Sequence, residues 1–106
     1  MRKLYDYLNA DFSSWSQEIR VHATKRMYQR NISHADLRTI LSNGFVIEEY
    51  DTDFPFPSIL LNGKSENGRS IHVVVGVDAE EKRLYIITVY EPELEKWTDD
   101  FSRRLE

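Results

Sequence analysis

The chain has 106 residues, enough for one domain with a real hydrophobic core but too few for two. It contains no cysteine, which excludes disulfides and thiolate metal sites. The net charge of −4 argues against a nucleic-acid binder, but the charge is uneven. Residues 1–44 hold seven Lys or Arg against four acids, whereas residues 45–106 hold seven against fourteen. A basic surface on the N-terminal part is compatible with this asymmetry, although scattered surface charge is the commoner explanation.

No targeting or membrane segment is predicted. No apolar segment follows Arg2 and Lys3, as one would in a signal peptide. No apolar run approaches the roughly 18 residues of a membrane-spanning helix. We therefore expect a cytoplasmic protein without a membrane partner.

The first 44 residues carry helical patterns. A short amphipathic helix is predicted over Lys3–Leu8, and a longer helix over residues 15–30, with Ser14 or Ser16 as its N-cap. Ser33 and Asp36 form a capping-box-like start for a further helix over residues 34–42. The longer helix would bury a stripe at four-residue spacing, made of Trp15, Ile19, Ala23 and Met27.

The second part of the chain reads as strands. Runs rich in Val, Ile and Tyr predict two central strands over residues 71–77 and 84–90, joined as an antiparallel hairpin. Two further strands are predicted over residues 45–50 and 58–62. A short C-terminal helix over residues 93–100 would pack Trp97 onto the fold, and residues 101–106 would be a frayed end. Helices followed by strands indicate an α+β fold, with the helices on one face of a four-stranded antiparallel sheet.

One candidate site lies on the longer helix. His22, Arg26 and Arg30 follow one another at four-residue spacing and would form a polar stripe beside the buried one. Histidine can move protons near neutral pH, and arginine can hold a phosphate with two hydrogen bonds. These residue types suit phosphodiester chemistry. From spacing alone, a half-buried histidine with two solvated arginines is the more common reading.

The other polar candidates lie within the central strands. His72 shares a face of its strand with Val74, and Thr88 shares one with Tyr90. His22 and His72 would converge if the helices packed on the face onto which His72 looks. For each residue taken singly, a structural role within the sheet is the commoner case. Arg69 stands just before the first central strand.

Other kinds of site are not indicated. The three histidines lack the spacing of metal ligands, and no glycine-rich loop for phosphates is present. We therefore expect neither a metal nor a cofactor.

Several segments together resemble a known family. These segments are HATKRMYQRNIS, NGFVIEEY, PSILLNG, GRSIHVVVGV and IITVYEP, followed by Trp97. In order and spacing they resemble the DUF4258 family over residues 19–97, which leaves residues 1–18 as a partly helical N-terminal extension and residues 98–106 as a tail. One departure is Asn31, where the family usually has glycine; both tolerate a left-handed backbone.

The resemblance implies a fold and a function. It implies a relationship to RelE-like, barnase-like and colicin-type RNases, and to toxins of toxin–antitoxin pairs whose partner is a small zinc-finger antitoxin. RNA, either mRNA or ribosome-associated, would be the substrate. The residues that match the polar positions of the family are His22, Arg26, Arg30, Arg69, His72 and Tyr90.

Two hypotheses follow for the function. The first is a metal-independent endoribonuclease, in which the 2′-hydroxyl of RNA attacks the adjacent phosphorus. His22 or His72 would be the base and the other the acid, while Tyr90 would transfer a proton or stack on a base. Phosphate would be held by Arg26, Arg30, Arg69 and Lys25. The second hypothesis is a non-catalytic interaction module of the same fold, whose acidic C-terminal half docks on a basic partner.

Overall fold

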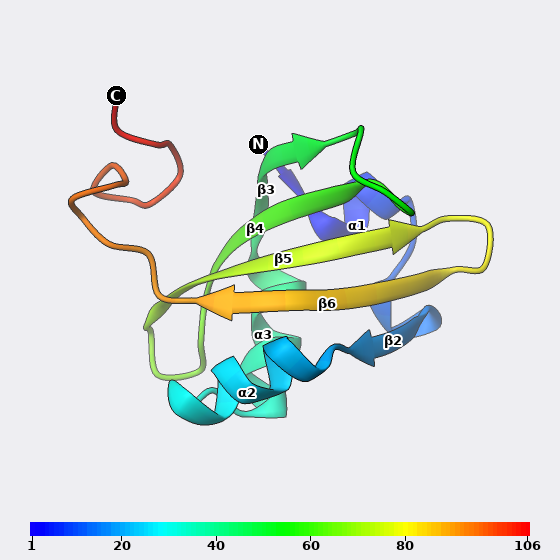
Figure 1. The fold of residues 1–106 in the computed structure, drawn as a ribbon, viewed down its shortest axis with the longest axis horizontal. Helices are drawn as coiled ribbons and strands as arrows, with labels where there is room; N and C mark the ends of the chain where they lie inside the picture. The colour runs from blue at the N-terminus through cyan, green and yellow to red at the C-terminus, as the bar shows by residue number, and fades with distance from the viewer.

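The computed structural model describes residues 1–106 as an α+β fold built around one sheet (Figure 1). No helix in it is both long and apolar enough to cross a membrane. In chain order, the elements are β1 (Arg2–Lys3), α1 (Leu4–Leu8), a 3-10 turn η1 (Phe12–Ser14), β2 (Ser16–Ile19), α2 (Val21–Gln29), α3 (His34–Asn43), β3 (Phe45–Tyr50), β4 (Ser58–Lys64), β5 (Ser70–Asp78) and β6 (Arg83–Tyr90).

The sheet has six strands in the order β1-β3-β4-β5-β6-β2, and it is mixed. Its four central strands, β3-β4-β5-β6, are antiparallel as predicted, and they lie side by side in chain order. The prediction of four strands was wrong at both edges, where β1 pairs antiparallel with β3 and β2 pairs parallel with β6. The additional strands satisfy backbone groups that would otherwise remain unpaired at the sheet edges.

The predicted helix over residues 15–30 begins later than expected. Residues 16–19 form β2, and α2 starts only at Val21, after Arg20. Arg20 makes no side-chain cap, so the proposed capping by Ser14 or Ser16 was wrong. The parallel bonds to β6 explain the difference, because the amide of Ser16 donates to the Lys82 carbonyl just before β6 and that of Arg20 to the Ile86 carbonyl within it. Trp15, Ala23 and Met27 are nevertheless buried.

The helix α3 follows its sequence signals closely. Ser33 accepts a hydrogen bond from the Asp36 amide, and the Asp36 carboxylate accepts one from the Ser33 amide, so the capping box is present. The apolar side of α3 buries Leu37, Ile40 and Leu41 against the sheet. Asn31, between α2 and α3, has the left-handed backbone expected of it (φ 55°).

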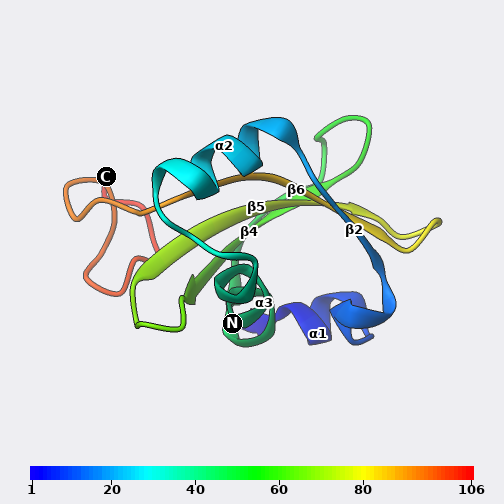
Figure 2. The ribbon, with the colours of Figure 1, turned by 90° about the horizontal axis from the view of Figure 1, so that it is seen from below.

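Different parts of the chain pack on the two faces of the sheet. The inner face, which carries Ile71, Val73 and Val75 on β5, packs into the main core with the helices. In Figure 2, α1 and α3 lie on one side of the strands, whereas α2 runs beside β6 at the sheet edge. The outer face carries the alternate positions, among them His72, and no helix lies on it. The C-terminal segment, residues 93–106, covers part of it.

The C-terminal segment is ordered by contacts instead of by a helix. The prediction of a helix over residues 93–100 was wrong, since this stretch forms turns. Trp97 is buried as predicted, at 3% exposure. The expected fraying of residues 101–106 was also wrong: Arg104 forms a bridge with Trp97, and the Leu105 amide donates to the Lys96 carbonyl. Tertiary contacts of this kind have no local sequence signal.

Candidate functional site

His72 is the buried centre of the polar side chains on the outer face. It has no exposed surface, and both ring nitrogens have partners. Nε2 lies 2.8 Å from the Phe101 carbonyl, which can only accept, so Nε2 carries the proton. Nδ1 lies 3.1 Å from the Tyr90 hydroxyl and therefore accepts its hydrogen bond. The Trp97 ring closes this site edge-on, with its centroid 4.5 Å from that of His72.

These surroundings keep His72 neutral. The pKa of His72 is lowered from 6.5 to about 4, chiefly by burial and to a smaller extent by the charge of Arg104. The bond to the Phe101 carbonyl and the charge of Glu48 act in the opposite direction but do not compensate. At neutral pH, His72 is therefore a hydrogen-bonded neutral imidazole that joins β5 to the C-terminal segment.

Tyr90 connects His72 to an open pocket of about 280 Å³. The pocket lies between α2, the end of β6 and the C-terminal segment. Burial raises the pKa of Tyr90, so its hydroxyl stays protonated and can donate to His72. Three cations meet there, because α2 contributes two arginines and the C-terminal segment a lysine. Its lining residues are Arg26, Arg30, Thr88, Tyr90, Glu91, Pro92, Glu93, Lys96 and Trp97.

The cations of this pocket are only partly neutralised. Lys96 lies 3.9 Å from Glu93, an exposed pair of small energetic value. Glu91 also lines the pocket, and it lies 3.6 Å from Arg69, which does not. Arg26 and Arg30 make no ion pair with an acidic side chain. Guanidinium groups in this condition remain available to an anion such as a phosphate.

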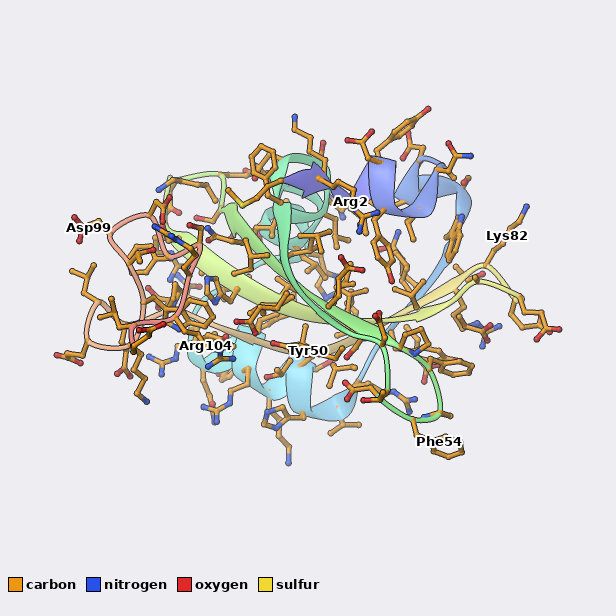
Figure 3. The ribbon with its side chains drawn as sticks, turned by 90° about the horizontal axis from the view of Figure 1, so that it is seen from above. Arg2, Tyr50, Phe54, Lys82, Asp99 and Arg104 are labelled. Carbon is orange, nitrogen blue, oxygen red and sulfur yellow. The ribbon has the colours of Figure 1, made fainter.

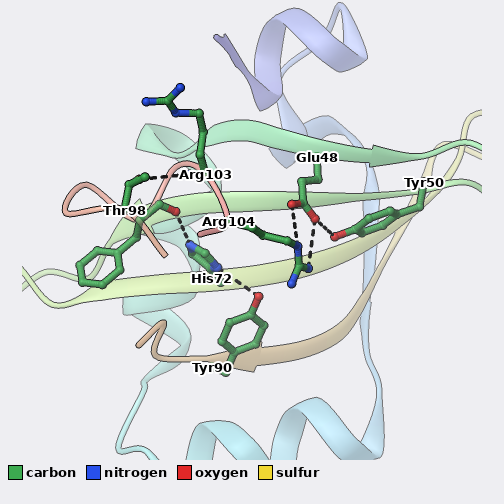
Figure 4. Close-up of polar contacts among 8 residues, drawn as sticks. Glu48, Tyr50, His72, Tyr90, Thr98, Arg103 and Arg104 are labelled. Atoms are coloured by element: carbon green, nitrogen blue, oxygen red, sulfur yellow. Dashed lines mark hydrogen bonds and ion pairs between the residues drawn. The ribbon is translucent and has the colours of Figure 1, made fainter. Parts of the chain in front are cut away.

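A second polar cluster on the outer face was missed in the sequence. Glu48 on β3 accepts two hydrogen bonds from Arg104, with Nε at 2.9 Å and Nη2 at 3.2 Å (Figure 4). It also accepts one from the Tyr50 hydroxyl. Burial acts to raise the pKa of Glu48, but these bonds outweigh it and lower the pKa. Arg104 also stacks on Trp97, with its guanidinium carbon 4.7 Å from the ring centroid.

The sequence held one signal for this cluster. Glu48 and Tyr50 alternate along a strand, which places both on one face. Their partner Arg104 lies 56 residues further along the chain, in a stretch expected to be frayed. Only the folded C-terminal segment brings the three side chains together.

The structure does not bring His22 and His72 together. The convergence was expected only if the helices packed on the face of the sheet onto which His72 looks, and they pack on the other face. His22 is exposed in the first turn of α2, its side chain makes no hydrogen bond, and it does not line the pocket. Lys25 is likewise exposed on α2 and outside the pocket. A two-histidine acid and base pair is therefore not formed.

Arg69 stabilises the fold instead of facing the pocket. Its Nη1 and Nη2 each donate to a backbone carbonyl at the end of α2, those of Arg30 and Asn31, at 2.8 Å. These bonds satisfy carbonyls that the helix leaves unpaired. Arg69 thus ties β5 to α2 and has little capacity left for a ligand.

No group of three His, Asp or Glu side chains is arranged to hold a metal ion. The polar groups of the pocket and of the outer face are instead phenols, guanidiniums, one imidazole, one lysine and several carboxylates. They can hold an anion and can pass a proton from Tyr90 to His72.

A family model described as "Domain of unknown function (DUF4258)" matches residues 19–91. The chain belongs to this DUF4258 family. Comparisons with curated proteins and with solved structures found no match. The DUF4258 match includes His72, Tyr90, Arg26, Arg30 and Glu48, whereas the C-terminal segment that covers His72 lies beyond its end. The matched region thus supplies the pocket's α2 and β6 walls, and the following residues supply Lys96, Trp97 and Arg104.

Proposed function

We propose that this DUF4258 protein binds RNA in the pocket at Tyr90 and cleaves it without a metal ion, by attack of the 2′-hydroxyl on the adjacent phosphorus. The observation that carries the proposal is the meeting of Arg26, Arg30 and Lys96 with the Tyr90 hydroxyl in one open pocket. Cleavage of this kind requires cations for the charge on phosphorus and a group that moves protons. The pocket offers both.

In the proposed step, Arg26 and Arg30 hold the phosphate. The 2′-hydroxyl gives its proton to the Tyr90 oxygen while the Tyr90 proton moves to Nδ1 of His72. The 2′-oxygen bonds to phosphorus, the bond from phosphorus to the 5′-oxygen breaks, and Lys96 protonates that leaving oxygen. The products are a 2′,3′-cyclic phosphate and a 5′-hydroxyl. The proton on His72 then returns through Tyr90 to solvent, and Lys96 regains one from solvent.

The pKa of His72 limits the rate of this step. With a pKa of about 4, protonating His72 at pH 7 costs about 4 kcal/mol. The negative phosphate lowers this cost by its charge. We therefore expect slow cleavage, unless binding of RNA or of a ribosome also displaces the C-terminal segment from His72.

The test is cleavage of single-stranded and ribosome-bound RNA in EDTA. We compare wild type with Tyr90→Phe and with the double variant Arg26→Gln/Arg30→Gln. Each should lose cleavage about 100-fold or more, the usual contribution of a proton-transfer group or of charge stabilisation. Arg38→Gln removes an exposed arginine from α3, outside the pocket, and should keep full activity.

The chemical groups at the ends of the cleaved RNA identify the reaction. Wild type should produce 2′,3′-cyclic phosphate ends in the presence of EDTA. Full activity of Tyr90→Phe, or equal losses in Arg38→Gln and the double variant, would contradict the proposed site.

A second candidate function is a non-catalytic interaction module of the same fold. The observation favouring it is that both nitrogens of His72 are already engaged in a fully buried position. In that case Tyr90 and His72 anchor the C-terminal segment, and the acidic residues 45–106 dock on a basic partner. Binding without cleavage, on free RNA and on ribosomes alike, would favour this module.

A further inference from the structure

A second hollow, of about 150 Å³, lies on the outer face at the end away from His72. Aromatic rings dominate it. The rings of Phe56 and Tyr85 stack with centroids 5.3 Å apart and planes only 8° from parallel. The Arg20 guanidinium carbon lies 4.7 Å from the centroid of the same Tyr85 ring. Planar groups therefore already stack at this position, and one of them carries a positive charge.

Phe54 stands at the rim of this hollow with no cover. Its exposed fraction is 94%, and Figure 3 shows it projecting from the loop between β3 and β4. A ring at this exposure buries almost no apolar area, so it contributes almost nothing to the stability of the fold. Its position beside a stacked pair of rings is suited to holding a further flat, apolar surface.

The sheet leaves room for such a ligand. Gly76 on β5 faces the hollow and lacks a side chain, and Ile87 beside it is partly exposed. A Cβ atom at Gly76 would make ordinary contacts, 3.4 Å from Ile87 Cδ1 and 3.5 Å from Tyr85 Cβ, so the glycine keeps the surface low between these two side chains. The hollow is thus lined mainly by rings and by the low surface at Gly76, and its charged residues are Arg20 and Asp53.

The hollow and the Tyr90 pocket are connected along one strand. Tyr85 and Ile87 of β6 line the hollow, and Thr88 and Tyr90 line the pocket. The distance from Tyr85 to Tyr90 is roughly 16 Å at the usual rise of a strand. A short length of single-stranded nucleic acid can span it. Arg20 lies at the hollow and Arg26 at the pocket, so both can contact the phosphates of a strand that runs along β6.

We propose that this hollow is a base-stacking subsite, in which an unpaired RNA base stacks on Phe54 and against the Phe56–Tyr85 pair. The inference rests on the proposed function, because it places a neighbouring nucleotide of the same RNA. Aromatic rings and arginine planes are the groups on which proteins stack unpaired bases. Stacking tolerates different bases, so the subsite contributes affinity more than sequence preference.

The experiment measures the equilibrium binding of a labelled single-stranded RNA of eight nucleotides by the full chain. The RNA carries 2′-O-methyl groups, which remove the attacking hydroxyl, so that cleavage cannot disturb the measurement. Phe54→Ala should weaken binding at least about fivefold, because stacking on an aromatic ring contributes about 1–3 kcal/mol per base. Phe54→Trp should restore it. Since Phe54 is exposed, neither variant should affect folding.

Tyr28→Ala is the matched control. Tyr28 is also strongly exposed, at 89%, but it lies about 200° around α2 from both Arg26 and Arg30. Its loss should leave RNA binding unchanged. An RNA carrying 4-thiouridine should crosslink to the peptide containing Phe54 and Phe56.

The outcomes separate the two proposals. If Phe54→Ala binds like wild type while Arg26→Gln/Arg30→Gln binds weakly, the stacking subsite is refuted and the proposed function stands. If wild type binds neither this RNA nor its unmodified form, the proposed function fails and the subsite fails with it. Equal losses in Phe54→Ala and Tyr28→Ala would indicate nonspecific contact through exposed rings and would also refute the subsite.

Discussion

The neutral, buried state of His72 predicts how the stability of the protein depends on pH. The folded-state pKa of about 4 lies below the ordinary value of 6.5, so the unfolded chain binds more protons between these values. The contribution of His72 is thus intact above pH 6.5 and is lost as the pH falls towards 4. From pH 7 to pH 5, the free energy of unfolding should fall by about 2 kcal/mol through His72 alone.

The assay is urea unfolding followed by tryptophan fluorescence at pH 7, 6 and 5. Of the two tryptophans, Trp97 packs against His72 and Trp15 lies in the main core, so the emission follows the unfolding of both parts of the molecule. His72→Gln keeps a donor for Phe101 and an acceptor for Tyr90 but does not titrate. The unfolding free energy of this variant should therefore fall much less between pH 7 and pH 5. His22→Gln removes an exposed histidine, and its unfolding free energy should fall as much as that of wild type. Carboxylates with lowered pKa, such as Glu48, lose their contribution mainly below this window. Equal losses in wild type and His72→Gln would refute the assignment of His72 as a buried neutral group.

Two further predictions concern packing and the C-terminal segment. Gly63→Ala should cost about 1–3 kcal/mol in urea unfolding, because its Cβ would lie 2.8 Å from Ile40 Cγ2 and 3.2 Å from the Gly44 backbone. Gly76→Ala, which meets only ordinary contacts, should cost less; the reverse order would contradict the packing of α3 on β4. Arg104→Ala should lower the unfolding free energy by only about 1 kcal/mol or less, since its side chain is 60% exposed. It should nevertheless speed amide exchange in residues 98–106, and unchanged exchange there would show that Trp97 alone holds the segment.

The elements that sequence reasoning found have local causes. The central strands β5 and β6 are rich in β-branched and aromatic residues, and α3 starts at a capping box that needs only Ser33 and Asp36. Such signals act between residues that are close in the chain. The same reasoning brought Arg26, Arg30 and Tyr90 to attention, and these do line one pocket.

The errors have non-local causes. Residues 16–19 satisfy a helical spacing through Trp15 and Ile19, but the open edge of β6 gives them backbone partners that a helix would not share. The C-terminal segment has no regular structure, and it is ordered by contacts with residues up to 56 positions away. The role of Arg69 likewise depends on the end of α2, which lies 38 and 39 residues earlier.

The sequence by itself determined the α+β class, the central antiparallel strands, the start of α3 and the set of polar residues worth considering. Only the tertiary structure decided which of them meet. Strand alternation places Thr88 and Tyr90 on one face of their strand, but neither the pairing of Tyr90 with His72 nor the face that the helices cover follows from it. That choice depends on packing across the whole sheet. It leaves His22 in solvent, puts His72 beneath the C-terminal segment, and brings Arg26 and Arg30 to Tyr90.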